Sequence, residues 1–167
     1  MRKTAAMILM LILIFAFSGC VKQDISPEAI CFNFNCKADV IIDNQKLTCQ
    51  LNRSAPEIIS IQIVSGDLNG LLYDWDGENF SISYSGITAK SDNCILPKTA
   101  FAETLKQILD CACKEGALTK THGNEFSGKY NDLDFTIATD GNGQIKKITI
   151  PKRGITAELY EYTDQGL

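Results

Sequence analysis

Most of the chain from residue 32 to residue 162 alternates apolar and polar side chains in short runs, with turn-forming residues between the runs. A period of two places all the apolar side chains of a run on one face of a β-strand. The connections between neighbouring runs are too short for the crossovers that parallel strands need, so we expect an antiparallel sheet. The pattern predicts about nine to ten strands, over residues 32–40, 47–53, 59–63, 71–75, 80–85, 117–122, 125–130, 133–139, 144–150 and 155–162.

One segment departs from this period. Apolar residues at Phe101, Leu105, Ile108 and Leu109 have the spacing of an amphipathic helix, which we expect to run from residue 98 or 99 to residue 113. A helix of about 15 residues covers only ~23 Å of a sheet, so the sheet must curve to hide its apolar face. We therefore predict a mainly β (α+β) fold, a curved antiparallel sheet or half-barrel with this one central helix covering its concave face.

The first 19 residues have the composition of an export signal. Arg2 and Lys3 precede an apolar run over residues 5–17, which is too short to span a bilayer comfortably but suits a signal-peptide core. The 16 basic residues of the chain, less these two, leave 14 against 20 acidic ones, a net charge of −6 for the mature protein. Because phosphate binding needs clustered basic residues, this balance excludes nucleic acid as a partner.

The residues Phe17-Ser18-Gly19-Cys20 that end the apolar run resemble the lipobox of bacterial lipoproteins. The resemblance implies cleavage before Cys20, lipidation of its thiol and anchoring of an extracytoplasmic protein to a bacterial membrane. The alternative is an ordinary secretory signal with an unmodified Cys20. We accordingly expect a lipoprotein signal peptide over residues 1–19, a lipidated tether over 20–30 and a single domain over 31–167.

The six remaining cysteines suggest disulfides in an exported protein, but their positions oppose most pairings. Cys31 and Cys36 are an odd number of positions apart on one expected strand, so their side chains point to opposite faces. With a turn at residues 43–46, Cys49 would face Val40, about 13 Å along the strand from Cys36. Free buried thiols are the favoured interpretation, and a bridge from Cys94 to one of the helical cysteines, Cys111 or Cys113, stays open.

The order of features also resembles the LolA-like half-barrel of lipoprotein carriers and their lipoprotein relatives, over most of residues 31–162. The matching features are a Phe-rich first strand, a strand that ends in Arg and Pro, an Asp-Gly hairpin, a helix led by Leu-Pro and a later Asp-x-x-Gly-x-Ile hairpin. In this sequence they are Phe32 and Phe34, Arg53-Ser54-Ala55-Pro56, Asp76-Gly77-Glu78-Asn79-Phe80, Leu96-Pro97, and Asp140-Gly141-Asn142-Gly143-Gln144-Ile145. Soluble carriers of that family lack a lipobox, so a lipid-anchored relative is nearer than a shuttle.

The resemblance implies a cavity between sheet and helix that holds acyl chains, and the alternation of the strands points to the same surface. The side chains expected to converge there are Phe34, Ile61, Trp75, Phe80, Ile82, Tyr84, Phe101, Leu105, Phe135, Ile137 and Ile148. The alternative is that these side chains fill a closed core.

Catalysis has little support in the sequence. The chain lacks a nucleophile elbow, a zinc-protease motif and a phosphate loop, and it has a single histidine, His122, without a cysteine cluster around it. We expect no cofactor and no metal. Two functions follow: binding of lipid or acyl chains by a membrane-anchored lipoprotein, or a non-catalytic interaction platform that holds or regulates an envelope or spore-cortex enzyme.

Overall fold

The computed structural model describes residues 25–98 and 100–163. These residues form eleven strands, one α-helix and three short 3-10 helices. The strands are β1 (Phe34–Ile42), β2 (Gln45–Ala55), β3 (Ile58–Ile63), β4 (Leu72–Asp76), β5 (Phe80–Tyr84), β6 (Ile87–Ser91), β7 (Leu118–His122), β8 (Glu125–Tyr130), β9 (Leu133–Thr139), β10 (Ile145–Ile150) and β11 (Ile155–Thr163). The helices are α2 (Phe101–Ala112), η1 (Pro27–Ala29), η2 (Gly66–Leu68) and η3 (Pro151–Arg153).

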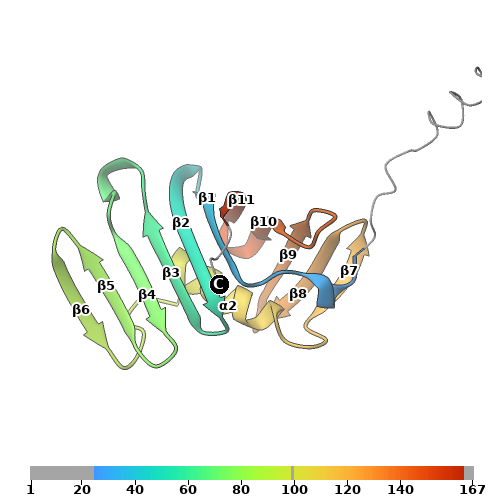
Figure 1. Ribbon diagram of the computed structural model, residues 1–167, viewed down its shortest axis with the longest axis horizontal. Helices are drawn as coiled ribbons and strands as arrows, with labels where there is room; N and C mark the ends of the chain where they lie inside the picture. Colours follow the sequence, from blue (N-terminus) through green and yellow to red (C-terminus); the bar gives the residue numbers. More distant parts are fainter. Residues whose placement is uncertain (1–24, 99, 164–167) are drawn as a thin grey trace, which may run out of the picture.

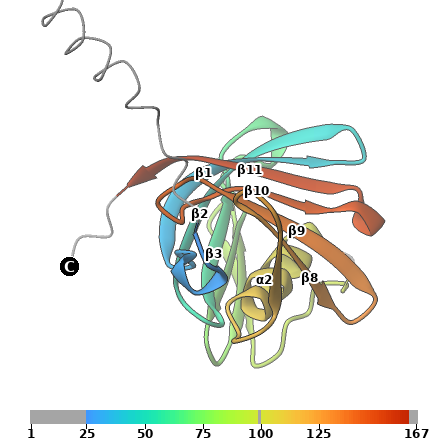
Figure 2. The ribbon, with the colours of Figure 1, turned by 90° about the vertical axis from the view of Figure 1, so that its right-hand side faces the viewer.

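All eleven strands belong to one antiparallel sheet in the order β6-β5-β4-β3-β2-β1-β11-β10-β9-β8-β7. The first and last strands in the chain, β1 and β11, pair in the middle of the sheet, so β6 and β7 form its two edges (Figure 1). The sheet is strongly curved and does not close, and α2 lies inside the curve (Figure 2). The expected mainly β half-barrel with one helix on its concave face is thereby confirmed, with one strand more than expected.

The additional strand is β6, which sequence alternation did not reveal. Its apolar residues are Ile87 and Ala89, and four of its five side chains are exposed. A strand that buries so few side chains shows no alternation of apolar and polar residues. It forms because the turn at Ser85 and Gly86 brings it beside β5, with which it pairs.

The hairpin between β1 and β2 is tighter than we expected from the sequence. Asp43 and Asn44 both adopt positive φ, at 48° and 68°, as the central residues of the two-residue turn favoured in hairpins. Cys49 therefore faces Ala38 rather than Val40. The expected register was wrong by two positions, an even number, so every side chain still lies on the expected face.

The helix is also shorter than expected. It begins at Phe101, just after Ala100, whose amide donates to the Pro97 carbonyl at 2.8 Å. Cys113 is its C-cap rather than its last helical residue, and Thr99 lies outside the described residues. The side chains that α2 turns toward the sheet are Ala102, Leu105, Ile108, Leu109 and Ala112.

The segment before β1 packs against the β7 edge. The Lys120 ammonium donates to the Ile25 carbonyl at 2.6 Å, and the Cys31 amide donates to the Gly143 carbonyl at 2.9 Å. Cys31 was expected on the first strand, but it makes only an isolated parallel bridge to Gln144 because β1 begins at Phe34. Ile25 and Ile30, which fall in the expected tether, are buried in this contact.

The six cysteines among the described residues are all free thiols. Cys36 and Cys49 are buried on β1 and β2, where they face Leu51 and Ala38 and not each other. The expected free thiols are found, but only Cys36 and Cys49 are buried as expected, since Cys31 is exposed and the other three are partly buried. The bridge left open between Cys94 and the helix does not form.

Candidate functional site

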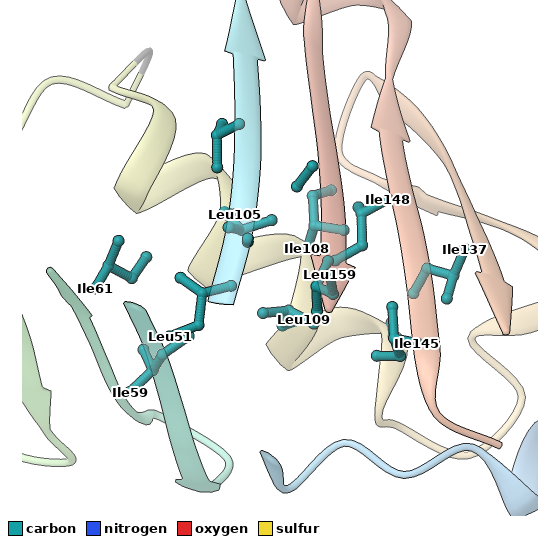
Figure 3. Packing of buried hydrophobic residues seen from close by; sticks show 14 of the residues in the cluster. Leu51, Ile59, Ile61, Leu105, Ile108, Leu109, Ile137, Ile145, Ile148 and Leu159 are labelled. Carbon is teal, nitrogen blue, oxygen red and sulfur yellow. The ribbon is translucent and has the colours of Figure 1, made fainter. Parts of the chain in front are cut away.

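Side chains of the hydrophobic core occupy the middle of the space between sheet and helix. Ile61 on β3, Leu105 on α2, and Ile137 and Ile148 on the far strands are all fully buried in one hydrophobic cluster. Figure 3 shows these side chains reaching toward one another from both halves of the sheet and from α2. None of these four side chains lines any of the three cavities described below.

Most of the side chains that the sequence assigned to a ligand cavity belong to this core. The buried ones are Phe34, Ile61, Trp75, Phe80, Leu105, Phe135, Ile137 and Ile148. Ile82 and Phe101 are partly buried against the cluster, and Tyr84 is exposed. The structure thus brings ten of the eleven to one cluster, as its core or its margin, and leaves one outside.

Along β5, from Phe80 to Tyr84, the side chains on the inner face of the sheet become progressively more exposed to solvent. Phe80 is 1% exposed, Ile82 is partly buried and Tyr84 is 40% exposed, although all three point to the same face. Ile87 of β6, the cross-strand neighbour of Tyr84, is 76% exposed. The 12 residues of α2 do not cover this corner of the sheet. We call the partly buried side chain of Ile82 and the exposed side chains of Tyr84 and Ile87 the open strip.

An ion-pair cluster fixes α2 to the sheet near the β2–β3 turn. The Arg53 guanidinium, which is 1% exposed, donates to Asp110 Oδ1 at 2.9 Å and to the Phe32 carbonyl at the same distance. Asp110 Oδ2 pairs with Lys106 at 2.8 Å, and Asp110 Oδ1 also accepts from the Glu57 amide at 3.0 Å. Burial raises the pKa of Asp110, but the Glu57 amide, Lys106 and Arg53 together hold it below its usual value.

A cavity of about 360 Å³ lies beside the N-terminal half of α2, between the helix, the β4–β5 hairpin and the segment that follows β6. We call it the α2–β4 cavity. Trp75 and Phe80 contribute its aromatic wall, with ring centroids 4.9 Å apart and planes tilted by 46°. The charged residues that line it are Glu57, Glu78, Asp92, Glu103 and Lys106.

Two polar atoms of residues in this lining are almost fully buried. They are Oε2 of Glu103 and Nε1 of Trp75. The other oxygen of Glu103, Oε1, accepts from Gln107 Nε2 at 2.6 Å. The Cys94 thiol also lines the cavity and interacts with both side chains. Burial and the hydrogen bond to Glu103 raise the pKa of this thiol, while the interactions with Leu96 and Trp75 lower it.

Sequence reasoning did not identify Glu103, Cys94 or Asp92 as site residues. Glu103 stands on the buried face of the helix, where its carboxylate is out of place, and that polar position in an apolar stripe is the one signal that could have found it. Cys94 and Asp92 lie outside regular structure and carry no periodic signal.

Two further hollows lie elsewhere. One of about 310 Å³ separates the segment with Ile30 and Phe32 from the C-terminal end of α2. The other, of about 620 Å³, is open and lies over β7 to β9, where Thr119, Ser127 and Thr136 line it.

Within residues 25–98 and 100–163, no helix is long and apolar enough to cross a membrane. The same residues contain no group of three or more His, Cys, Asp or Glu side chains placed to hold a metal ion. No family model matches the chain, and the comparison with curated proteins finds no significant match.

Proposed function

We propose that the mature protein is a membrane-anchored, extracytoplasmic lipoprotein that acts as a non-catalytic interaction platform for another envelope protein. The packed centre of the half-barrel is the observation that carries this choice. Ile61, Leu105, Ile137 and Ile148 are fully buried and line none of the three cavities described above, which favours a filled interior over a preformed space for acyl chains. The anchor in this proposal is Cys20, which lies outside the described residues.

The position of the open edge supports a protein partner over a lipid. Ile25 lies five positions after Cys20, a stretch that spans at most ~18 Å, and it is held against the β7 edge. The β6 edge lies ten strand spacings away, ~48 Å along the curved sheet. Figure 1 shows β6 and β7 at opposite ends of the sheet, so an anchor at Cys20 would keep the β7 edge near the bilayer and leave β6 free to project away from it.

The occupant that fits this edge is an extended segment of the partner, added antiparallel to β6. An edge strand presents unpaired backbone donors and acceptors, and strand addition uses them for affinity. Apolar side chains of the added strand would then cover Ile87 and the rest of the open strip.

A second candidate is lipid binding, and the open strip favours it because an acyl chain could also cover Ile82, Tyr84 and Ile87. The LolA-like resemblance points the same way. Native mass spectrometry of a secreted Cys20→Ser form separates the two: the platform predicts the bare polypeptide mass, whereas retained lipid would favour the second candidate.

Photo-crosslinking tests the partner in intact cells. A benzophenone side chain at Thr88 on β6 should capture a single envelope protein, and the same group at Thr156 in the middle of the sheet should not. Ile87→Asp should abolish the capture because it places a charge on the strip. Ile95→Asp, at a similarly exposed isoleucine off the edge, is the matched control and should leave it intact. Capture of phospholipid, capture of a second copy of this chain, or capture insensitive to Ile87→Asp would contradict the proposal.

A further inference from the structure

The free edge of β6 presents its backbone groups in a defined register. β6 follows β5 through a two-residue turn, whose central residues both adopt positive φ, at 49° and 81°. In such a hairpin the residues that flank the turn exchange both hydrogen bonds, and bonded and non-bonded pairs then alternate along the strands. Ile87 and Ala89 therefore bond to β5, whereas the N–H and C=O groups of Thr88 and Lys90 point to the open edge.

The side chains of β6 alternate between the two faces of the sheet. Ile87, Ala89 and Ser91 pair with inner-face residues of β5, and the two residues between them point to the outer face. Ala89 contributes only a methyl group and pairs with Ile82, which is partly buried. A large apolar side chain laid across Ala89 can therefore reach Ile82 of the open strip. An added strand should present apolar side chains opposite Ile87 and Ala89.

The Ser91 end of β6 is acidic. The exposed carboxylates of Glu78 and Asp92 line the α2–β4 cavity there. Lys90 points to the outer face and pairs with Asp76 at 3.4 Å. Neither Glu78 nor Asp92 forms an ion pair with another of the described residues. A basic side chain of a partner at this end would complement both carboxylates, and such complementarity fixes register and orientation.

The Ile87 end offers mainly apolar contact. It adjoins the uncharged turn after β5, and the Tyr84 hydroxyl donates to the main-chain carbonyl of Asp67 at 2.9 Å. Leu68, the next residue, is 44% exposed. The two ends of the edge therefore differ, so a bound strand has a preferred direction.

We propose that the partner segment follows the pattern basic, unrestricted, large apolar, unrestricted, apolar, from its N-terminus to its C-terminus. Antiparallel addition places these five positions opposite, in order, Ser91, Lys90, Ala89, Thr88 and Ile87. The basic side chain then lies on the inner face, toward Glu78 and Asp92. The second and fourth residues exchange hydrogen bonds with the free backbone groups of β6. This inference rests on the proposed strand addition and specifies the segment that the edge accepts.

Amide hydrogen exchange followed by NMR tests the register on the secreted Cys20→Ser protein. In the protein alone, the amides of Thr88 and Lys90 should exchange faster than that of Ala89. A glycine-flanked peptide, Arg-Thr-Ile-Thr-Val, should bind with a dissociation constant in the millimolar range or tighter. At ten times that concentration it should slow exchange at Thr88 and Lys90 about tenfold. Slow exchange of both amides without peptide, or no protection with it, would overturn the proposal.

Three further peptides test the pattern. One replaces Arg by Glu, one reverses the order to Val-Thr-Ile-Thr-Arg, and one shifts the alternation to Arg-Ile-Thr-Val-Thr. Each should bind about threefold more weakly or worse, because it loses the charge match, the direction or the apolar face. Equal binding of all four, or tighter binding of the reversed peptide, would overturn the proposal.

A charge swap locates the basic position. Glu78→Lys combined with Asp92→Lys should reverse the preference, so that the Glu peptide binds more tightly than the Arg peptide. Asp134→Lys combined with Glu158→Lys changes two exposed carboxylates on β9 and β11 and is the matched control. It should leave the preference for Arg unchanged. An unchanged preference in the Glu78 and Asp92 variant would refute the assignment of the basic residue.

The segment captured in cells separates this inference from the proposed function. Mass spectrometry of the peptide crosslinked to the benzophenone at Thr88 should find a basic residue on the N-terminal side of alternating apolar residues. A captured envelope protein whose crosslinked segment lacks this pattern would overturn the inference and leave the proposed function standing. Failure to capture any envelope protein would contradict the proposed function and the inference with it.

Discussion

Asp110 is the residue on which the attachment of the helix depends. Its two oxygens serve Arg53, Lys106 and the Glu57 amide, so one carboxylate ties α2 to β2 and to the β2–β3 turn. Arg53 is almost wholly buried, and a buried guanidinium that loses its carboxylate is left with an uncompensated charge. Removing Asp110 alone should therefore destabilise the protein more than replacing all the charged residues of the cluster with apolar ones.

The Asp110→Asn variant tests this dependence. We expect it to lower the free energy of unfolding by about 3 kcal/mol at neutral pH, because Arg53 and Lys106 lose their counter-ion. Asp134→Asn, at an exposed carboxylate 4.0 Å from Lys129, should cost less than about 0.5 kcal/mol and serves as the control. Urea unfolding monitored by circular dichroism measures both.

The same variant predicts a change in acid sensitivity. The folded pKa of Asp110 is lowered from 3.8, so its contribution to stability is present above 3.8 and is lost as pH falls through the lower, folded-state value. Asp110→Asn removes this proton-linked contribution. Below the folded pKa the difference in stability between wild type and variant should therefore shrink. A difference that stays constant with pH would show that Asp110 does not act through its charge.

The cysteines give a second prediction at this scale. Burial raises the pKa of both Cys36 and Cys49 to about 12, which makes their thiolates scarce near neutral pH, whereas Cys31 is exposed. Iodoacetamide should label Cys31 in the native protein and spare Cys36 and Cys49. In urea without reductant it should label all three. Mass spectrometric detection of a linked pair among them would contradict the structure.

At the scale of elements, the pairing of β8 with β9 depends on a glycine. Gly128 lies directly opposite Phe135, and the ring of Phe135 occupies the space where a side chain on residue 128 would stand. A Cβ there would lie 2.3 Å from Phe135 Cζ and 3.0 Å from the Ala117 carbonyl oxygen. The aromatic ring thus closes the inner face over a strand that has no side chain of its own at that position.

We expect Gly128→Ala to destabilise the protein by about 1 to 3 kcal/mol through overpacking. The neighbouring Ser127→Ala, on the other face of β8, should change stability little. Phe135→Leu in the Gly128→Ala background should cost less than it does alone, because the smaller side chain relieves the clash. Thermal melting of the four variants measures this coupling, and strictly additive effects would argue against the contact.

At the scale of the whole molecule, the two edges of the sheet differ. The segment from Ile25 to Cys31 packs beside β7, while β6 is the opposite edge and carries the most exposed isoleucine among the described residues, Ile87. The outer face of the sheet is polar, with cross-strand ion pairs such as Lys37 with Glu161 and Lys147 with Glu158. The proposed interaction with a partner therefore involves β5 and β6.

The proposed anchor predicts where the protein is found in the cell. Cys20→Ser should move it from the membrane fraction to the soluble fraction, because a thioether-linked lipid is the attachment that remains after cleavage. Cys31→Ser, a change at another exposed thiol, should leave it in the membrane fraction. Fractionation followed by immunoblotting decides the matter, and a Cys20→Ser protein still wholly in the membrane would refute lipidation.

The sequence by itself determined the elements and the face of each strand. Alternation over Phe80, Ile82 and Tyr84 and the 3-4-7 spacing after Phe101 are local patterns, so ten of the eleven strands and the single described α-helix were predictable to within a few residues. Short connections likewise determined antiparallel pairing. The sequence did not predict β6, because an exposed edge strand needs no alternation of apolar residues, only a neighbouring strand to pair with.

Whether the half-barrel is hollow was decided by the tertiary structure alone. Ile61, Leu105, Ile137 and Ile148 are far apart in the chain. Whether a space remains between them depends on how much of the volume enclosed by the curved sheet these side chains fill together. The α2–β4 cavity arises in the same way. Glu103 of α2 and Trp75 of β4 both line it, and this proximity of distant segments is one that no local pattern records.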